Sequence, residues 1–366
     1  MYSEKTLYYI ALSMIPSIGP LLARQLIAYV GSAEQIFKEK PKNLAKIPKI
    51  GEVLAESIAY AQTLNMAERE LQFAQKNNIS IVLSSDENYP QRLKNCEDAP
   101  LFFFSKGLVD FNAPKILSIV GTRTMSDYGK RLCKDFVQQI APHNPIIVSG
   151  LAFGVDICAH KAALDAGLHT IAVLPTQFTQ ITPPQHINYL QAIVQQGAAI
   201  TEIHTQQKFD PGLYVRRNRI IAGLSDAVIV VESKKKGGAL ITADFANQYN
   251  REVCTFPGNV GNKLSEGCNA LIKQNKATLI ENATDVERLL NWDTNKKKKT
   301  IQKQLFVELS NDEQRIVELL TKTAKLPIDT IANEINVPMS KISSVLLNLE
   351  FKGMVTSLPG KQYSLT

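Results

Sequence analysis

Three arginines and an asparagine lie together in the segment Arg216-Arg217-Asn218-Arg219, shortly before an apolar run that predicts a buried strand over Ala227 to Glu232. Guanidinium groups offer planar, charge-assisted donors to phosphate oxygens, and an asparagine amide can bind a phosphate or a base edge. An isolated run of charges is more often a solvated cationic turn. Because this segment lies at the mouth of an α/β unit, we favour a site for a polyanion.

Glycine-bearing loops follow two other predicted strands upstream. The first comes after a strand expected over 115–120, and the second after a strand expected over 145–149. Glycine lets backbone N–H groups approach an anion, hydroxyl groups add donors, and a helix start adds a favourable dipole. The candidate residues in these loops are Gly121, Thr122, Arg123, Ser126, Ser149, Gly150, Ala152, Phe153 and Gly154.

Two more loops of this kind occur downstream, over 233–239, with Lys235 and Gly238, and from Pro257 to Gly267. None of the four loops is a Walker A or Gly-x-Gly-x-x-Gly sequence, so each is weak evidence alone. Ligands of parallel sheets collect at the carboxyl ends of the strands. We therefore expect the four loops to meet in one anion-binding groove.

The positioning elements form three regions of different composition. Residues 1–80 predict an all-α domain, in which Ile15 to Gly19 and Ile47 to Gly51 repeat a pattern typical of helix-hairpin-helix turns. Such turns either hold a DNA phosphate or serve only as helix punctuation, and the structural role is favoured. Residues 81–290 alternate short β-branched runs with helical stretches, which predicts an α/β domain with a mainly parallel, extended Rossmann-like sheet. Strands are expected over 79–83, 115–120, 145–149, 170–174, 198–201, 227–232 and 252–256, and helices over 129–140, 156–166, 188–196 and 239–250.

The last region begins after a basic linker over 291–304. This linker carries +4 of the formal net charge of +7. The net positive charge of the whole chain is therefore weak evidence for nucleic-acid binding. Residues 305–366 predict three helices and a hairpin, the pattern of a winged helix. This region is slightly acidic and its third helix has few cations. The sequence is therefore equally consistent with a role in protein contacts and a role in DNA binding.

The composition is that of a soluble globular protein of two or three domains, with 366 residues, 45% hydrophobic and 20% charged. The five cysteines and five histidines show no spacing for a metal, so neither a metal nor a cofactor is expected. No stretch approaches the roughly 18 apolar residues of a membrane span, and no signal-peptide cleavage site follows the first apolar run. We expect a cytoplasmic protein with no membrane partner.

Taken in order, these motifs resemble the DNA-processing protein A (DprA/Smf) family over nearly the whole chain. The resemblance implies a Rossmann-like domain that binds single-stranded DNA without marked sequence preference and has no catalytic residues. It also implies a homodimer that loads the RecA recombinase on this DNA during natural transformation. The segments that carry it are Gly121 to Arg123, Ser149 to Asp156 with His160, Arg217 to Ser225, Gly238 to Ala243, and Pro257-Gly258 with Ser265 and Gly267.

Two departures from the family pattern concern the groove. Members often read Phe-Pro-x-Arg-Asn-Arg where this chain has Tyr214-Val215 before its arginines, and some have a lysine in place of Phe153. We expect Arg123, Arg217 and Arg219 to neutralise phosphates, with Arg216 assisting. For Asn218 and Arg219, a structural hydrogen-bond network that ties them to the sheet is given the same weight as contact with the ligand.

Two other classes of function are weighed against strand binding. The pair Gly237-Gly238 followed by Thr242 faintly resembles a loop of lysine-decarboxylase-like phosphoribohydrolases, which would make the chain a nucleotide-processing enzyme. A transcription regulator acting through the winged helix is the third class. The polar residues nearest the loops are interpreted structurally: Asp156 as a helix cap, His160 as facing the sheet or the loop before it, and Glu202 as an arginine partner.

Overall fold

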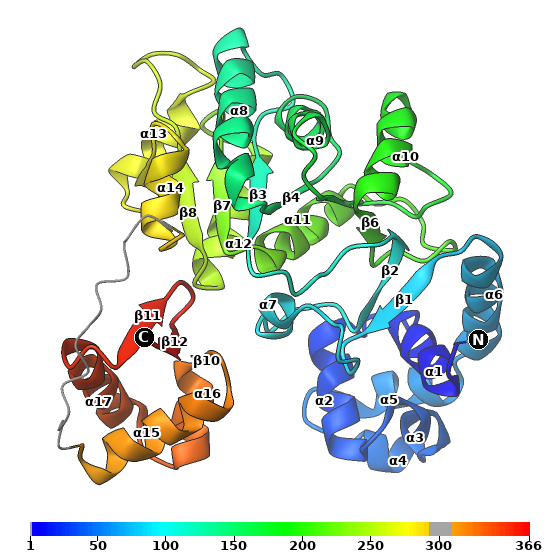
Figure 1. Cartoon of the computed structure of the whole chain (residues 1–366). Coiled ribbons are helices and arrows are strands. Elements are labelled where there is room, and N and C mark those ends of the chain that lie inside the picture. Colours follow the sequence, from blue (N-terminus) through cyan, green and yellow to red (C-terminus); the bar gives the residue numbers. More distant parts are fainter. Residues whose placement is uncertain (1, 293–308) are drawn as a thin grey trace.

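The computed structural model describes residues 2–292 and 309–366 (Figure 1). Both turns of the internal repeat directly precede a helix, α2 and α5. The hydrophobic core of the N-terminal helices continues into the first hairpin of the sheet through Leu83, Phe102 and Phe104. The N-terminal helices are α1 (Glu4–Ser13), α2 (Pro20–Val30), α3 (Ala33–Lys38), α4 (Pro41–Leu44), α5 (Gly51–Ala59) and α6 (Thr63–Lys76).

A nine-stranded sheet forms the centre of the α/β domain, in the order β1-β2-β6-β5-β4-β3-β7-β8-β9. The strands from β6 to β9 in this order pair in parallel, and the β1–β2 hairpin joins β6 antiparallel. The predicted mainly parallel Rossmann-like sheet is therefore confirmed. The strands are β1 (Ser80–Leu83), β2 (Phe102–Gly107), β3 (Ile116–Val120), β4 (Ile146–Ser149), β5 (Thr170–Val173), β6 (Ala198–Thr201), β7 (Ala227–Val230), β8 (Glu252–Thr255) and β9 (Thr278–Leu279).

Helices cover both faces of this sheet. Side chains of α8, α9 and α14 pack on one face, and those of α11, α12 and α13 on the other. The helices are α7 (Gln91–Lys94), α8 (Asp127–Ile140), α9 (Val155–Asp165), α10 (Ile187–Gln196), α11 (Gly212–Leu224), α12 (Gly238–Gln248), α13 (Glu266–Lys273) and α14 (Ala283–Leu289).

The strand order reverses at β3. From β3 the chain proceeds through β4, β5 and β6 in one direction, and β7, β8 and β9 lie on the opposite side. The loops after β3, β4 and β7 therefore leave the sheet around a topological switch point, where α/β proteins open a crevice. This topology determines where a ligand site forms.

The arginine segment, which was not among the predicted helices, is helical in the structure. It lies within α11, whose buried residues Leu213, Arg217, Ile220, Ile221 and Leu224 recur at helical spacing. With Val215 in place of proline, the backbone N–H and φ constraints of proline are absent and the helix continues through this position. The strand β2 was also missed, because its sequence contains no β-branched residue, unlike the runs that predicted the parallel strands.

The second predicted small domain is also confirmed as a winged helix. It comprises α15 (Asn311–Lys322), β10 (Leu326–Pro327), α16 (Ile328–Ile335), α17 (Met339–Phe351), β11 (Val355–Leu358) and β12 (Gln362–Leu365). A capping box between Ser310 and Glu313 starts α15, as predicted. The predicted linker lies outside the described residues from 293 onward.

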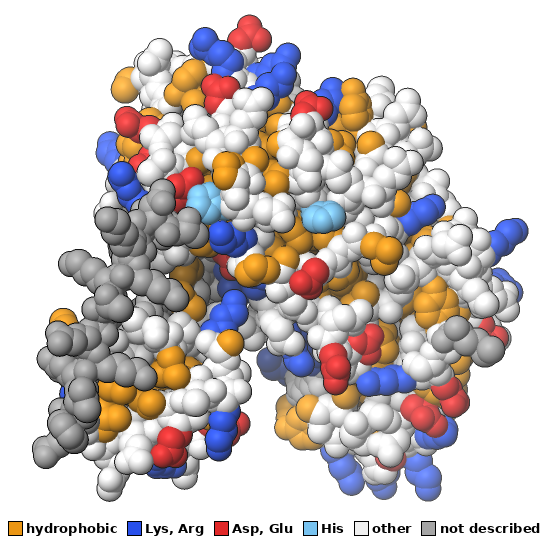
Figure 2. Space-filling view, viewed as in Figure 1, with side chains coloured by type: hydrophobic (Ala, Val, Ile, Leu, Met, Phe, Trp, Pro, Cys, Tyr) orange, Lys and Arg blue, Asp and Glu red, His pale blue; other side chains and the backbone are white. Residues whose placement is uncertain are grey.

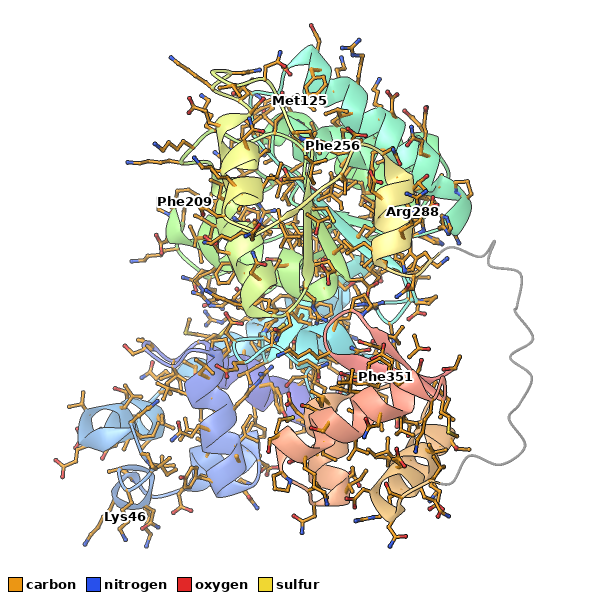
Figure 3. The ribbon with its side chains drawn as sticks, turned by 90° about the vertical axis from the view of Figure 1, so that its left-hand side faces the viewer. Lys46, Met125, Phe209, Phe256, Arg288 and Phe351 are labelled. Atoms are coloured by element: carbon orange, nitrogen blue, oxygen red, sulfur yellow. The ribbon has the colours of Figure 1, made fainter. Side chains whose placement is uncertain are left out.

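The surface shows no single basic patch on the face of Figure 2, where Lys and Arg side chains are spread over all parts of the molecule. In Figure 3, Phe256 lies inside the α/β domain, whereas Phe209 lies at its edge and is 57% exposed. Within residues 2–292 and 309–366, no helix has the length and apolar character to cross a bilayer.

Candidate nucleic-acid interface

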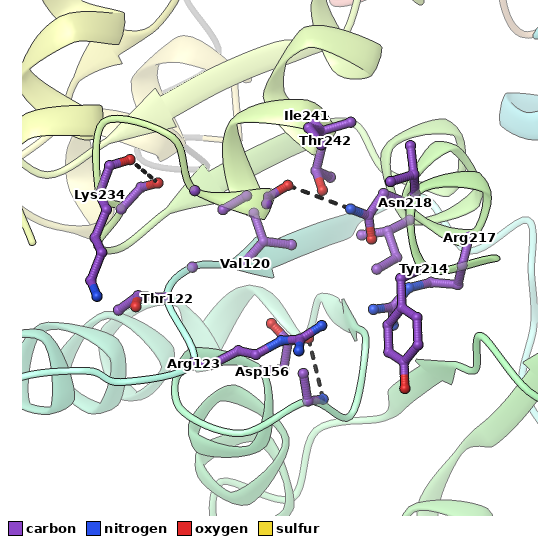
Figure 4. A pocket seen from close by; sticks show the side chains of 18 of the residues that line it. Val120, Thr122, Arg123, Asp156, Tyr214, Arg217, Asn218, Lys234, Ile241 and Thr242 are labelled. Carbon is purple, nitrogen blue, oxygen red and sulfur yellow. Dashed lines mark hydrogen bonds between the residues drawn. The ribbon is translucent and has the colours of Figure 1, made fainter. Parts of the chain in front are cut away.

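A cavity of about 460 Å³ opens at the switch point, between the loops after β3, β4 and β7 and the first half of α11 (Figure 4). Its position follows from the sheet topology, since these loops leave adjacent strand ends. The residues that line it are Val120, Gly121, Thr122, Arg123, Thr124, Ala152, Asp156, Tyr214, Val215, Arg217, Asn218, Ile221, Ser233, Lys234, Gly237, Gly238, Ala239, Ile241 and Thr242.

Three of the four predicted loops meet at this cavity, and the fourth does not line it. The loop from Pro257 to Gly267 lies behind the third loop, where the Gly267 N–H donates to the Ser233 carbonyl over 2.8 Å. The expectation that four loops form the groove is therefore corrected to three. Of the candidate residues, Gly121, Thr122, Arg123, Ala152, Arg217, Asn218 and Gly238 line it.

Glycine brings the first two loops into contact. The Thr122 N–H donates to the Glu232 carbonyl over 2.8 Å, and the Thr122 carbonyl accepts from the Val155 N–H over 3.1 Å. A Cβ on Gly121 would overlap Val155, and Gly154, with φ 76°, presses directly on the Thr122–Arg123 backbone. Both glycines are required by close backbone approach.

Arg123 presents an exposed cation at the cavity mouth. Its guanidinium carbon lies 5.2 Å from the centre of the Tyr214 ring, and Tyr214 in turn meets the exposed Phe209 ring edge-on at 6.4 Å. Rings of this kind offer stacking surfaces for bases beside a phosphate-binding arginine. Sequence reasoning missed both rings as stacking surfaces, although Tyr214 lies only two positions before Arg216.

Arg217 is buried and links the carboxyl ends of two neighbouring strands. Its Nη1 donates to the carbonyls of Gly150 and Val173, each over 2.6 Å, at the ends of β4 and β5. Burial lowers the pKa of its guanidinium, and the nearby Asp156 carboxylate opposes this shift. Arg217, which we expected to bind a phosphate, therefore bonds carbonyls of the protein instead.

Asp156 lies under the second loop. Its Oδ2 accepts from the Ala152 N–H over 3.3 Å, which ties the loop to the start of α9. Burial raises the pKa of this carboxyl, and Arg217 is the largest influence that lowers it. Gly154 is the N-cap of α9 and this helix start has no side-chain capping bond, so the predicted cap role of Asp156 is corrected. Asp156 instead ties the second loop to the first turn of α9 and pairs electrostatically with Arg217.

Ser149, Gly150 and Ser126 have structural partners, which corrects their expected role as donors to a ligand. Ser149 Oγ is buried and donates to the Ile119 carbonyl over 2.6 Å. A side chain at Gly150 would overlap the Arg217 guanidinium. Ser126 caps α8 and donates to Glu232.

The other two arginines lie on the far side of α11 from the cavity. Arg219 is buried and bonds Glu202 and the Asp98 carbonyl, and Arg216 approaches Glu202 at 3.9 Å while half exposed. A helix places successive residues about 100° apart, so adjacent arginines cannot share one groove. The structural network considered for Arg219 and the pairing of Glu202 with arginine are both observed.

Three further candidates also lie outside the cavity lining. Phe153 is 45% exposed and meets the His186 ring at 4.8 Å, Lys235 is exposed, and Gly154 packs behind the first loop. Asn218 Nδ2 crosses the cavity to the Gly238 carbonyl over 3.4 Å (Figure 4). Lys234, which lines the cavity, was missed beside Lys235.

His160 faces the sheet, as predicted. Its Nδ1 lies 2.7 Å from Thr170 Oγ1, and burial is the main cause that lowers its pKa to about 3. A neutral imidazole in the core has a packing role.

The scaffold defines a Rossmann-like protein with a cavity at the switch point of its sheet, joined to helical and winged-helix domains. A family model described as DNA recombination-mediator protein A matches residues 80–291. Models of the DprA winged helix domain and of a SAM-like helix-hairpin-helix tandem match residues 304–361 and 9–60. The chain belongs to the DNA recombination-mediator protein A family, which confirms the resemblance seen in the sequence.

Individual relatives match this chain over most of its length. Protein Smf of Synechocystis is 29% identical over 396 residues, which cover 99% of each chain. Protein Smf of Escherichia coli is 33% identical over 322 residues, with 81% of this chain and 83% of that protein covered.

Two solved structures are similar to this one. The X-ray structure of DNA processing protein A from Streptococcus pneumoniae has a TM-score of 0.67 at 27% identity, covering 78% of this chain and 98% of that one. A structure that concerns the single-stranded DNA binding mode of DNA processing protein A from Helicobacter pylori has a TM-score of 0.53 at 28% identity, covering 59% and 96%.

Proposed function

We propose that this chain binds single-stranded DNA in the cavity at the switch point. The observation that carries the proposal is the exposed Arg123, held beside the Tyr214 and Phe209 rings by two glycine-bearing loops at adjacent strand ends. The Helicobacter pylori relative, described by its single-stranded DNA binding mode, supports it. Unpaired strands bind to such combinations of cations and aromatic rings.

The exposed side chains at and beside the cavity determine the proposed contacts with the DNA. Arg123, Lys234 and Lys235 neutralise phosphates, because their charged ends have no carboxylate partner among the described residues. Thr122 and Asn218 supply polar donors at the cavity wall, and Tyr214 stacks on a base. Binding of this kind involves no bond-making, so the chain acts as a binding protein.

We further propose that the bound strand is handed to the RecA recombinase by a homodimer formed through the α/β domain, with the protein protecting incoming DNA in natural transformation. The membership in a recombination-mediator family supports this role. We propose domain limits of 1–80, 81–290 and 305–366, with 291–304 as the linker. Light scattering of the full chain at micromolar concentration tests the dimer: a monomer contradicts it.

Fluorescence anisotropy of labelled oligo-dT with the full chain tests the binding itself. We expect single strands to bind more tightly than duplex of the same length, and Arg123→Gln to weaken binding about tenfold, the loss of one charge-assisted contact. Arg131→Gln, an exposed arginine of α8 outside the cavity, is the matched control and should bind as the unmodified chain does. Equal affinity for duplex, or an Arg123→Gln variant equal to the control, contradicts the proposal.

A parallel assay distinguishes strand binding from nucleotide chemistry. We expect the full chain to release no base from nucleoside monophosphates. Base release that Arg123→Gln abolishes would replace strand binding by a phosphoribohydrolase activity.

A further inference from the structure

A second, larger cavity lies on the opposite side of α11. It encloses about 800 Å³ between the turn before α2, the segment before β2 and the loop after β6. Arg216 and Arg219 line it, whereas Tyr214, Arg217 and Asn218 of the same helix line the first cavity. Helix α11 is therefore the wall between two cavities.

The start of α2 contributes free backbone donors to this cavity. Gly19, the N-cap residue, has extended backbone angles and makes no side-chain capping bond, and Pro20 begins the helix. Helices leave their first N–H groups without intrahelical partners, and here the first such groups belong to Leu21 and Leu22. This helix of 11 residues thus presents an uncapped N-terminus to the cavity, which suits an anion.

His204, in the loop after β6, is an independent sign of a ligand. Its side chain is 9% exposed and lines the cavity, and its Nδ1 has no hydrogen-bond partner among the described residues. Burial lowers its pKa to about 4, so the imidazole is neutral near pH 7. A buried, neutral ring nitrogen without a partner is suited to a hydrogen bond from or to a bound molecule.

The side chains that line the cavity carry more positive than negative charge, which favours an anion. Arg216, Arg219 and Lys208 contribute three cations, and Glu202 and Asp98 contribute two carboxylates. Glu202 accepts from Arg219 through Oε2, whereas its buried Oε1 has no hydrogen-bond partner among the described residues. Asp98 accepts from the Tyr249 hydroxyl. Arg216 stays 3.9 Å from Glu202 with its side chain 52% exposed, so it can turn to a phosphate.

Because α11 is the wall between the two cavities, the width of one helix sets the length of strand needed to reach both. A helix with its side chains is about 10–12 Å across. A stacked strand advances about 3.4 Å per nucleotide, so three or four nucleotides cross α11. Apolar side chains at the rim, among them the 56% exposed Leu21, offer a surface for a base.

We propose that the second cavity is a further subsite for the single strand, in which a phosphate lies between Arg216 and the start of α2 and a base lies against the apolar wall beside His204. This inference rests on the proposed strand binding at the first cavity. It gives the first helix-hairpin-helix turn a ligand, where sequence reasoning favoured a purely structural role.

The test compares oligo-dT of two lengths on the full chain by fluorescence anisotropy. A strand of about four nucleotides fills the first cavity only, and one of about twelve reaches both. We expect Arg216→Gln to weaken binding of the long strand about tenfold and to leave the short one unchanged. The salt slope for the long strand should fall by about 0.7, the loss of one phosphate contact.

Leu21→Glu provides a second variant, since it places a carboxylate at the exposed rim without touching Glu202 or Arg219. Leu21→Glu should weaken binding of the long strand only, whereas Arg131→Gln should change the binding of neither strand. If both cavity variants match Arg131→Gln for the long strand while the unmodified chain binds well, this inference is wrong and the first site stands. If the unmodified chain binds neither strand, the proposed function itself is wrong.

Discussion

Replacing Arg217 by alanine tests the assignment of this buried arginine to the scaffold. The guanidinium donates to the carbonyls of Gly150 and Val173 and offsets the buried Asp156 carboxylate. Each charge-assisted bond is worth about 1.5–3 kcal/mol, and breaking a buried charged arrangement costs about 3–5 kcal/mol. We therefore expect Arg217→Ala to lower the free energy of unfolding by about 3–5 kcal/mol, a large part of the about 5–15 kcal/mol that domains possess.

Urea unfolding of the full chain, followed by circular dichroism, measures this loss. Arg123→Ala is the matched control, because Arg123 is exposed on the same cavity. We expect the control to unfold as the unmodified chain does and to lose oligo-dT affinity. If Arg217→Ala instead keeps the original urea midpoint and loses affinity as Arg123→Ala does, Arg217 is a phosphate ligand and the structural assignment is refuted.

Two further predictions concern the core and the loops. The native pKa of His160, about 3, lies below its ordinary 6.5, so the unfolded chain binds more protons between these values and stability is lost as pH falls below 6.5. This residue should contribute a loss of about 2 kcal/mol between about pH 7 and about pH 5, and His160→Asn should flatten that dependence in urea titrations; an unchanged dependence contradicts the burial argument. Gly121→Ala forces apart the loops that meet at Val155 and should cost about 1–3 kcal/mol in thermal unfolding while weakening oligo-dT binding. A variant with the original melting temperature and affinity would contradict the close approach.

Much of the fold was predictable because many of its elements have a local signal in the sequence. The parallel strands are short β-branched runs, and the predicted strand over 198–201 matches β6 residue for residue. The capping box at Ser310 and the repeat before α2 and α5 depend on neighbouring residues only. Such signals do not require knowledge of the tertiary packing.

The candidate site was predictable in location and less so in detail. Topology places the loops with Gly121 and Gly238 at one cavity, but sequence alone does not tell which way each arginine points. Arg217 and Arg219 look equivalent in the sequence, yet one bonds carbonyls at the sheet edge and the other bonds Glu202. The helical spacing of Leu213, Ile220 and Leu224 would have revealed α11 and separated these faces.

The salt dependence of oligo-dT binding by the full chain tests the central claim most directly. Arg123 and Lys234 line the first cavity, Lys235 is exposed beside Lys234, and Arg216 lines the second cavity. Three or four phosphates are therefore neutralised, each adding about −0.7 to the slope of log affinity against log salt. We predict a slope of roughly −2 to −3 that becomes shallower by about 0.7 in Arg123→Gln. Binding that does not change with salt, or a slope that Arg123→Gln leaves unaltered, would contradict the account.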